Sequence, residues 1–326
     1  MKPPPAPDFW ARPGLVADLL GPLAWAHAAA GTARRALTRP WRAPVPVICV
    51  GNLVAGGAGK TPVVLSLARL LAERGARPHL LSRGYGGRAR GPLRVDPARH
   101  DAAEVGDEPL LLVRTAPTWI ARDRAAGAQA AIAAGASLIL MDDGFQNPGL
   151  EKDLSLLVID GAYGLGNGRV MPAGPLREPV ATALKRADAV VLMGEDEAAV
   201  APLVAPTPVL SARLRPTAGV PRDQPVIAFA GIGRPEKFFR TLAETGAPVI
   251  ARCGFADHHV YAEGDLLRLA EDAARAGARL VTTEKDAVRL PPAWRARVAV
   301  FAVEVAWQDA PALMAMLAHA LEKRRG

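Results

Sequence analysis

A glycine-rich loop between a strand and a helix constrains this chain more than any other feature of its 326 residues. The apolar, β-branched run 45–50 predicts a buried strand, and apolar residues at helical spacing from Val63 to Leu71 predict a helix. Between them lies the segment GNLVAGGAGKT, residues 51–61. A loop of this kind before a helix can turn its backbone amides toward phosphate oxygens. The pattern therefore predicts a binding site for a nucleoside triphosphate.

The residues of this loop have separate expected roles. The strict form of the motif, GxxxxGK[ST], requires glycine at position 54, where this chain has Val54, and the neighbouring glycines supply the same flexibility. The Thr61 hydroxyl is expected to bind Mg²⁺. We expect the phosphates to be held by Gly56, Gly57, Ala58, Gly59, Lys60 and Thr61.

A second apolar strand, residues 138–141, ends in Asp142 and Asp143. Enzymes with such a phosphate-binding loop bring a carboxylate to Mg²⁺ from the end of a neighbouring strand. A buried strand can also end in aspartate without binding a metal. Together with the loop, the pair predicts a magnesium site held by Thr61, Asp142 and Asp143.

Strands alternate with helices along the rest of the chain, which predicts an α/β fold with parallel strands. We expect a sheet like that of P-loop NTPases, flanked by helices, in residues 44–214. The later strands exceed the usual width of one sheet, about 4–6 strands. A smaller α/β domain is therefore expected in residues 215–326, with the polar, proline-containing stretch 215–225 at the boundary.

The N-terminal segment, residues 1–43, combines an apolar stretch at 15–30 with a basic cluster. The stretch is shorter than the roughly 20 apolar residues of a membrane span. A signal peptide fits poorly, because the start carries little positive charge and Asp18 interrupts the apolar run. A helix lying among lipid headgroups is favoured, and a helix packed on its own domain is the alternative. The basic residues are Arg34, Arg35, Arg39 and Arg42.

The net charge and the cysteine content limit the kinds of partner and site that this chain can have, but they do not identify a single partner. The formal net charge of +8 favours anionic partners, although an arginine excess is also produced by a GC-rich genome. The two cysteines, Cys49 and Cys253, exclude a disulfide scaffold and a cysteine-based zinc site. Their scarcity fits a reducing compartment.

Seven short motifs in order resemble the tetraacyldisaccharide 4′-kinase family and extend over most of the chain. Asn147 departs from the family, which more often has histidine there, so no role is assigned to that position. The motifs are GGAGKTP at 56–62, SRGYG at 82–86, GDEP at 106–109, DDGFQ at 142–146, PAGPLRE at 172–178, FADH at 255–258 and TTEKD at 282–286.

The resemblance implies a kinase that uses ATP and Mg²⁺ at the cytoplasmic face of a bacterial inner membrane. Its acceptor would be the 4′-hydroxyl of an acylated glucosamine disaccharide 1-phosphate, and its product lipid IVA of lipid A biosynthesis. The lipid surface would be a partner, whereas nucleic acid and an obligate protein partner are not expected.

The resemblance also implies site residues. Asp107 would accept the hydroxyl proton, paired with His258 from the other half of the chain, so that domain closure would assemble the site. Without the resemblance, Asp107 fits a helix cap and His258 a surface loop. Lys60 would complete the catalytic set. Glu108 is a further candidate metal ligand, and candidates for substrate or phosphate contact are Arg83, Tyr85, Arg124, Gln146 and Arg177.

Three other functions fit the sequence less well. A GTPase or metallochaperone NTPase typically recognises guanine through an [NT]KxD motif. This chain has TEKD at 283–286, in which lysine occupies the third position of the motif instead of the second. A nucleic-acid-binding ATPase would need aromatic stacking residues, and aromatic residues make up only 5% of the chain. A non-catalytic membrane scaffold leaves the loop and the paired aspartates unexplained.

Overall fold

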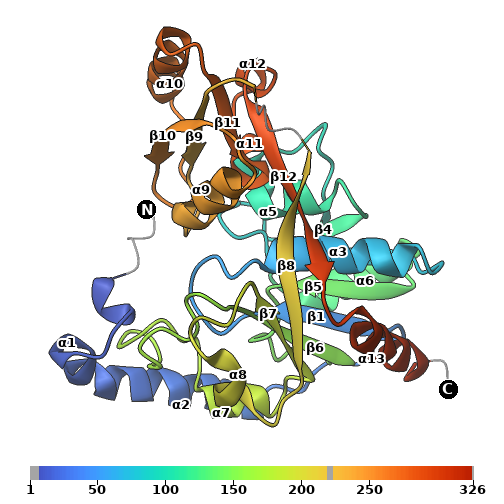
Figure 1. Ribbon diagram of the computed structural model, residues 1–326. Coiled ribbons are helices and arrows are strands. Elements are labelled where there is room, and N and C mark those ends of the chain that lie inside the picture. Colours follow the sequence, from blue (N-terminus) through green and yellow to red (C-terminus); the bar gives the residue numbers. More distant parts are fainter. Residues whose placement is uncertain (1–6, 219–222, 325–326) are drawn as a thin grey trace.

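The computed structural model describes residues 7–218 and 223–324. Residues 1–6 of the expected N-terminal segment lie outside this range, as do residues 219–222 and 325–326 of the expected smaller domain. Two lobes are visible in Figure 1, and two long strands, β8 (Val209–Ala218) and β12 (Ala299–Trp307), run between them.

The strands of the described residues form one twelve-stranded sheet, in the order β10-β9-β11-β12-β8-β7-β6-β1-β5-β2-β4-β3. In the larger lobe β1 is parallel to β5 on one side and to β6 on the other. Their carboxyl ends therefore meet at one edge of the sheet. The other strands are β1 (Val47–Gly51), β2 (Pro78–Ser82), β3 (Leu93–Arg94), β4 (Thr118–Ile120), β5 (Leu138–Asp142), β6 (Leu154–Asp160), β7 (Ala189–Met193), β9 (Val226–Ala230), β10 (Val249–Gly254) and β11 (Arg279–Thr283).

Helices cover both faces of the larger lobe's sheet. The strands β1, β5, β6 and β7 are buried along their whole length, as apolar parallel strands are when helices flank them on both sides. One face packs against α3 and α13, and the other against α6, α7 and α8. The helices are α3 (Lys60–Ala72), α4 (Ala102–Val105), α5 (Asp107–Leu112), α6 (Arg124–Ala133), α7 (Val180–Leu184), α8 (Val200–Val204) and α13 (Ala310–Glu322).

The smaller lobe is a second α/β unit, as the sequence predicts. In it β9 lies between β10 and β11, parallel to both. One face of this sheet buries Phe238 and Phe239 of α9, and the other buries Leu266 of α10 and Trp294 of α12. Its helices are α9 (Pro235–Glu244), α10 (Glu263–Arg275), α11 (Glu284–Ala287) and α12 (Pro292–Arg295).

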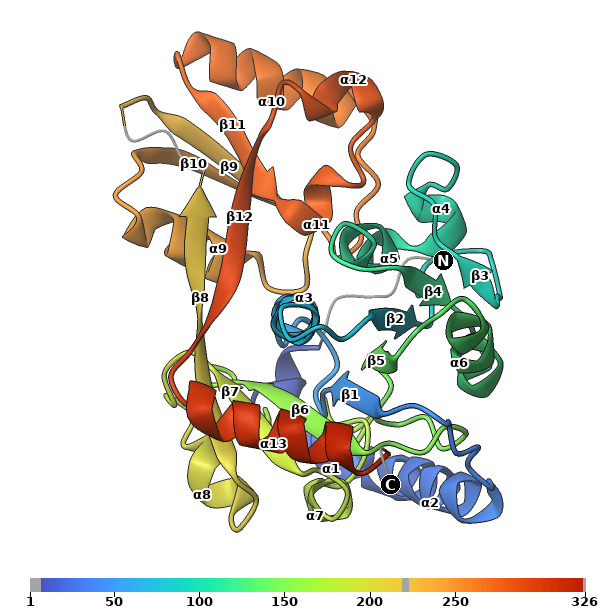
Figure 2. The ribbon, with the colours of Figure 1, turned by 90° about the vertical axis from the view of Figure 1, so that its right-hand side faces the viewer.

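The two lobes are joined differently from the sequence expectation of two separate sheets. Residues 215–218, expected at the domain boundary, continue β8, which pairs antiparallel with β12. Pro216 lies opposite Val303 beside a register shift, the kind of irregularity at which a strand accepts proline. After β12 the chain returns to the larger lobe, where Leu313 and Leu317 of α13 enter the core. Figure 2 shows this helix below the larger sheet.

The N-terminal apolar stretch forms two helices instead of one. Following η1 (Asp8–Trp10), α1 (Leu15–Leu19) ends before Gly21-Pro22, and α2 (Gly21–Leu37) begins there, because proline fits the first turn of a helix. Among the described residues, we find no helix with the length and apolarity needed to cross a membrane. Large exposed apolar side chains gather on both helices: Leu15, Val16, Leu19, Leu23 and Trp25.

Candidate active site

The glycine-rich loop leads from β1 into α3. Gly59 precedes α3 with a φ of +87°, a left-handed conformation that favours glycine. Because Gly59 has no side chain, the helix begins without a capping oxygen, and its first amides are available to a phosphate. At the other end of the loop, a Cβ on Gly51 would lie 2.4 Å from Cβ of Phe145. Only glycine therefore lets the loop pass this close to the segment after β5.

Asp143 follows β5 and is held by two cations. Its Oδ1 lies 3.6 Å from Nζ of Lys60 and accepts a hydrogen bond of 2.6 Å from Nη1 of Arg177. Burial acts to raise the pKa of Asp143, but the charges of Lys60 and Arg177 outweigh it and hold that pKa at about 2. The loop lysine and this carboxylate thus belong to one ionised cluster at the edge of the sheet.

Asp142, at the end of β5, is a buried carboxylate without a partner. Neither of its side-chain oxygens has a hydrogen-bond partner among the described residues. Burial, and next the charge of Glu108, raise its pKa, while Lys60 acts in the opposite direction. An unpaired buried carboxylate is costly and would be stabilised by a cation. The free oxygens of Asp142 are therefore suited to a cation such as Mg²⁺, although the described residues contain no group of three or more His, Cys, Asp or Glu side chains that could hold a metal ion by themselves.

A second cluster forms around Asp107, the first residue of α5. Its Oδ2 lies 3.0 Å from Nδ1 of His258, and its Oδ1 accepts a hydrogen bond from the amide of Glu108. The ring of Tyr85 lies against His258, with centroids 5.5 Å apart. The structure thus brings together an aspartate of the larger lobe and a histidine of the smaller lobe, 151 residues apart.

Two cations that sequence reasoning gave no role also hold Asp107. Nε of Arg289 lies 3.0 Å from Oδ2 of Asp107, and Nζ of Lys285 lies 3.9 Å from it and 3.2 Å from Oε1 of Glu108. Burial would raise the pKa of Asp107, but the His258 hydrogen bond and the two cations bring it well below its usual range. Asp107 is therefore ionised at neutral pH. Lys285 lies inside the TTEKD motif, and Arg289 lies four residues after Lys285. This closeness to a family motif was the sequence signal that could have indicated both residues.

The remaining candidates lie in three different settings. Gln146 is close to the first cluster, since its Oε1 accepts a hydrogen bond of 3.4 Å from Arg177. Arg83 and Tyr85 are exposed at the surface. Arg124 is only 3% exposed and donates a hydrogen bond to the carbonyl of Ala121. Its side chain therefore lies beneath the protein surface. Burial, and next the charge of Arg83, lower its pKa to about 10.

The smaller lobe also approaches the phosphate loop itself. A Cβ on Gly233, in the loop between β9 and α9, would lie 3.2 Å from the amide nitrogen of Gly57 and 3.2 Å from Oδ2 of Asp257. Both lobes therefore border the glycine-rich loop.

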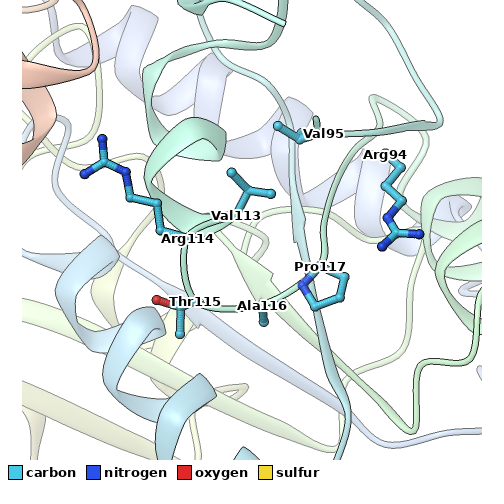
Figure 3. A pocket seen from close by; sticks show the side chains of 7 residues that line it. All are labelled: Arg94, Val95, Val113, Arg114, Thr115, Ala116 and Pro117. Carbon is cyan, nitrogen blue, oxygen red and sulfur yellow. The ribbon is translucent and has the colours of Figure 1, made fainter. Parts of the chain in front are cut away.

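A surface pocket of about 320 Å³ lies elsewhere, at residues 94, 95 and 113–117. Figure 3 shows that the guanidinium groups of Arg94 and Arg114 point away from each other. These two guanidinium groups therefore cannot bind one anion together. The pocket also contains none of the candidate site residues.

Comparison with known proteins supports one family. The family model described as tetraacyldisaccharide-1-P 4′-kinase (LpxK) matches residues 16–322. Proteins named tetraacyldisaccharide 4′-kinase from Rhodospirillum centenum and Gluconacetobacter diazotrophicus are 59% and 58% identical to this chain, over 96% and 93% of its length and 96% and 94% of theirs.

A solved structure agrees. The crystal structure of LpxK from Aquifex aeolicus in complex with ATP superposes with a TM-score of 0.78 and 28% identity, covering 94% of this chain and 100% of that one. The resemblance seen in the seven motifs is thereby confirmed. This chain belongs to the tetraacyldisaccharide-1-P 4′-kinase family.

Proposed function

We propose that this kinase of lipid A biosynthesis transfers the γ-phosphoryl group of ATP to the 4′-hydroxyl of a tetraacylated disaccharide 1-phosphate, forming lipid IVA. One observation carries the proposal: the phosphate loop with its ionised cluster adjoins the Asp107–His258 pair. A Cβ on Gly233 would lie 3.2 Å from the amide nitrogen of Gly57 in this loop and 3.2 Å from Oδ2 of Asp257, the residue before His258. A phosphate-binding site and a proton acceptor are thus adjacent, as a kinase requires.

The chain's own residues account for the parts of the reaction. The 4′ oxygen forms a bond to the γ-phosphorus, the bond from that phosphorus to the β–γ bridging oxygen breaks, and ADP leaves. The loop amides and Lys60 bind the phosphates and offset charge on the transferred group. The hydroxyl proton passes to the Asp107–His258 pair, whose carboxylate starts ionised. Because the pair spans the two lobes, it exists only while the lobes are together.

Mg²⁺ would be held by Thr61, Asp142 and Asp143, with Glu108 as a further ligand. Its chemistry is to neutralise charge on the phosphate oxygens during transfer. The unpartnered oxygens of Asp142 support this assignment.

The acceptor would be recognised at the exposed rim of the site. Tyr85 against His258 and the neighbouring Arg83 provide an aromatic face and a cation, which suit a sugar that carries phosphate. Gln146 and Arg177 would act nearer to the γ-phosphate, because Arg177 already pairs with Asp143.

The assay that tests this function uses radiolabelled ATP and the acylated disaccharide 1-phosphate. We expect Mg²⁺-dependent transfer of label to the lipid, and little transfer from labelled GTP. Label transfer from GTP at an equal rate, or nucleotide hydrolysis without a labelled lipid, would instead favour the alternative of another P-loop NTPase.

We further propose that the exposed apolar side chains of α1 and α2 enter the cytoplasmic face of the bacterial inner membrane, where the lipid acceptor resides. Leu19, Leu23 and Trp25 are 80%, 60% and 74% exposed, and basic residues follow them along α2. Burying such side chains in lipid is favourable, and arginines add attraction to anionic headgroups.

Replacing these three residues by serine is expected to lower binding to anionic vesicles by more than about tenfold, since each loses apolar area that lipid would cover. Co-sedimentation with the vesicles measures the bound fraction of each protein. Leu203→Ser, which changes a residue 57% exposed on α8, is the matched control and should bind as the unaltered protein does. Equal binding by the triple variant would move the membrane contact to another surface.

A further inference from the structure

Glu178 is a buried carboxylate that the proposed mechanism does not use. Its side chain is 3% exposed and contacts cations from two parts of the chain. Nη1 of Arg35, on α2, lies 3.2 Å from Oε2, and Arg186 donates to the same oxygen. The other oxygen, Oε1, accepts a hydrogen bond of 3.2 Å from Nε2 of Gln146. Burial of a charge is tolerated when it is paired in this way.

From Glu178 a continuous series of contacts leads to the phosphate loop. Gln146 accepts from Nη1 of Arg177 at 3.4 Å, and the same Nη1 donates to Asp143 at 2.6 Å. Asp143 in turn lies 3.6 Å from Lys60. Its backbone has a φ of +53°, an unfavourable value for aspartate that must be maintained by its surroundings. Asp143 is therefore held by Arg177, and Gln146 links Arg177 to Glu178 while also donating to the carbonyl of Asn52 at 3.0 Å.

In the other direction the series ends on the helix with the exposed apolar side chains. The face of α2 turned toward the protein carries Ala24, Ala28, Gly31 and Arg35, at helical spacing. The first three residues are small and offer little side-chain surface to hold α2 against the protein. Arg35 is the long side chain on this face, and it reaches a buried partner.

We propose that Arg35 and Glu178 are positioning residues that make the seating of α2 a condition for the alignment of Asp143. Contact of α2 with a lipid surface would thereby favour phosphoryl transfer at the moment the lipid acceptor is within reach. The inference rests on the proposed roles of Asp143 and of α2.

Arg35→Gln tests it, with Arg34→Gln as the matched control. Arg34 is exposed and adjacent on the same helix, so both variants lose one charge and the same attraction to anionic lipid. Glu178 keeps Arg186 in both, so the fold is retained. We expect kcat of Arg35→Gln on vesicle-borne acceptor to fall about tenfold, as when a group that orients a metal ligand is removed. The Mg²⁺ concentration for half-maximal rate should rise, and Arg35→Lys should restore most of kcat.

Hydrogen exchange provides a readout without substrate or metal. The amides of residues 143–146 should exchange faster in Arg35→Gln than in Arg34→Gln, because their side chains have lost an anchor. Glu178→Gln should lower kcat as well, and the double variant Arg35→Gln/Glu178→Gln should lose less than the product of the two single effects.

Equal kcat values for Arg35→Gln and Arg34→Gln, or equal exchange at residues 143–146, would overturn the inference. The unaltered protein and Lys60→Ala are assayed alongside. If the unaltered protein transfers no label to the lipid, the proposed function has failed. If the unaltered protein does transfer label and Lys60→Ala shows its expected loss of kcat, but the two arginine variants are alike, only the coupling through Arg35 has failed.

Discussion

Lys60→Ala is expected to lower kcat for lipid phosphorylation by about 10²–10³, because it removes a cation aimed at the charge that develops on the transferred phosphoryl group. Lys60 is the first residue of α3, and its Nζ lies 3.6 Å from Asp143, so it belongs to the ionised cluster at the sheet edge. Asp143 retains Arg177 in the variant, which limits damage to the cluster. The measurement is steady-state transfer of label from ATP to the lipid.

Lys185→Ala is the control for this variant. It removes an equal charge from an exposed position directly after α7 and should leave kcat unchanged. The folded state of both proteins is compared by thermal unfolding. Turnover of Lys60→Ala within about threefold of the unaltered protein would remove the phosphate role from the loop, because a positioned donor is worth far more than that.

Asp107→Asn is expected to lower kcat by about 10²–10⁴, since a positioned proton acceptor contributes an effect of that size. Asparagine preserves the shape of the side chain but cannot take the proton or neutralise the cations around it. Dissociation constants for ATP should stay within about threefold, because the phosphates are proposed to bind at Lys60 and the loop amides. Calorimetry measures ATP binding, and the lipid assay measures kcat.

Asp101→Asn is the matched control, because Asp101 caps α4 at an exposed position near Asp107. Its activity should be that of the unaltered protein. A second substitution, His258→Gln, should lower kcat as well and leave ATP binding intact. If Asp107→Asn retained full kcat, the proton acceptor would have to be sought in another group.

Much of the site could be predicted from short stretches of sequence. The loop before Lys60 and the aspartates after residue 141 are each defined by contiguous residues, since a strand, a turn and a helix start are local structures. Two such strands in a parallel sheet meet at one edge, which explains why Lys60 and Asp143 lie together. The motif at residues 106–109 likewise marked Asp107, although its assigned role depended on family resemblance.

Other features were missed because they depend on distant contacts. The proline at 216 and the polar residues around it predicted a domain boundary, yet β8 continues through residues 215–218 by pairing with β12. The burial of Arg124 follows from the packing of α6 on the sheet, which the residue type alone does not disclose. The local pattern also gave no reason for residues 310–322 to return to the core of the larger lobe.

By itself, then, the amino-acid sequence determined the phosphate loop, the acidic strand end, the alternation of strands and helices and the family. Only the tertiary structure decided which charges surround Asp107 and how α2 connects to Asp143. Arg289 is 182 residues from Asp107, and Arg35 is 143 residues from Glu178. Such pairs form because packed helices and strands bring their side chains within reach, and no local periodicity encodes that approach.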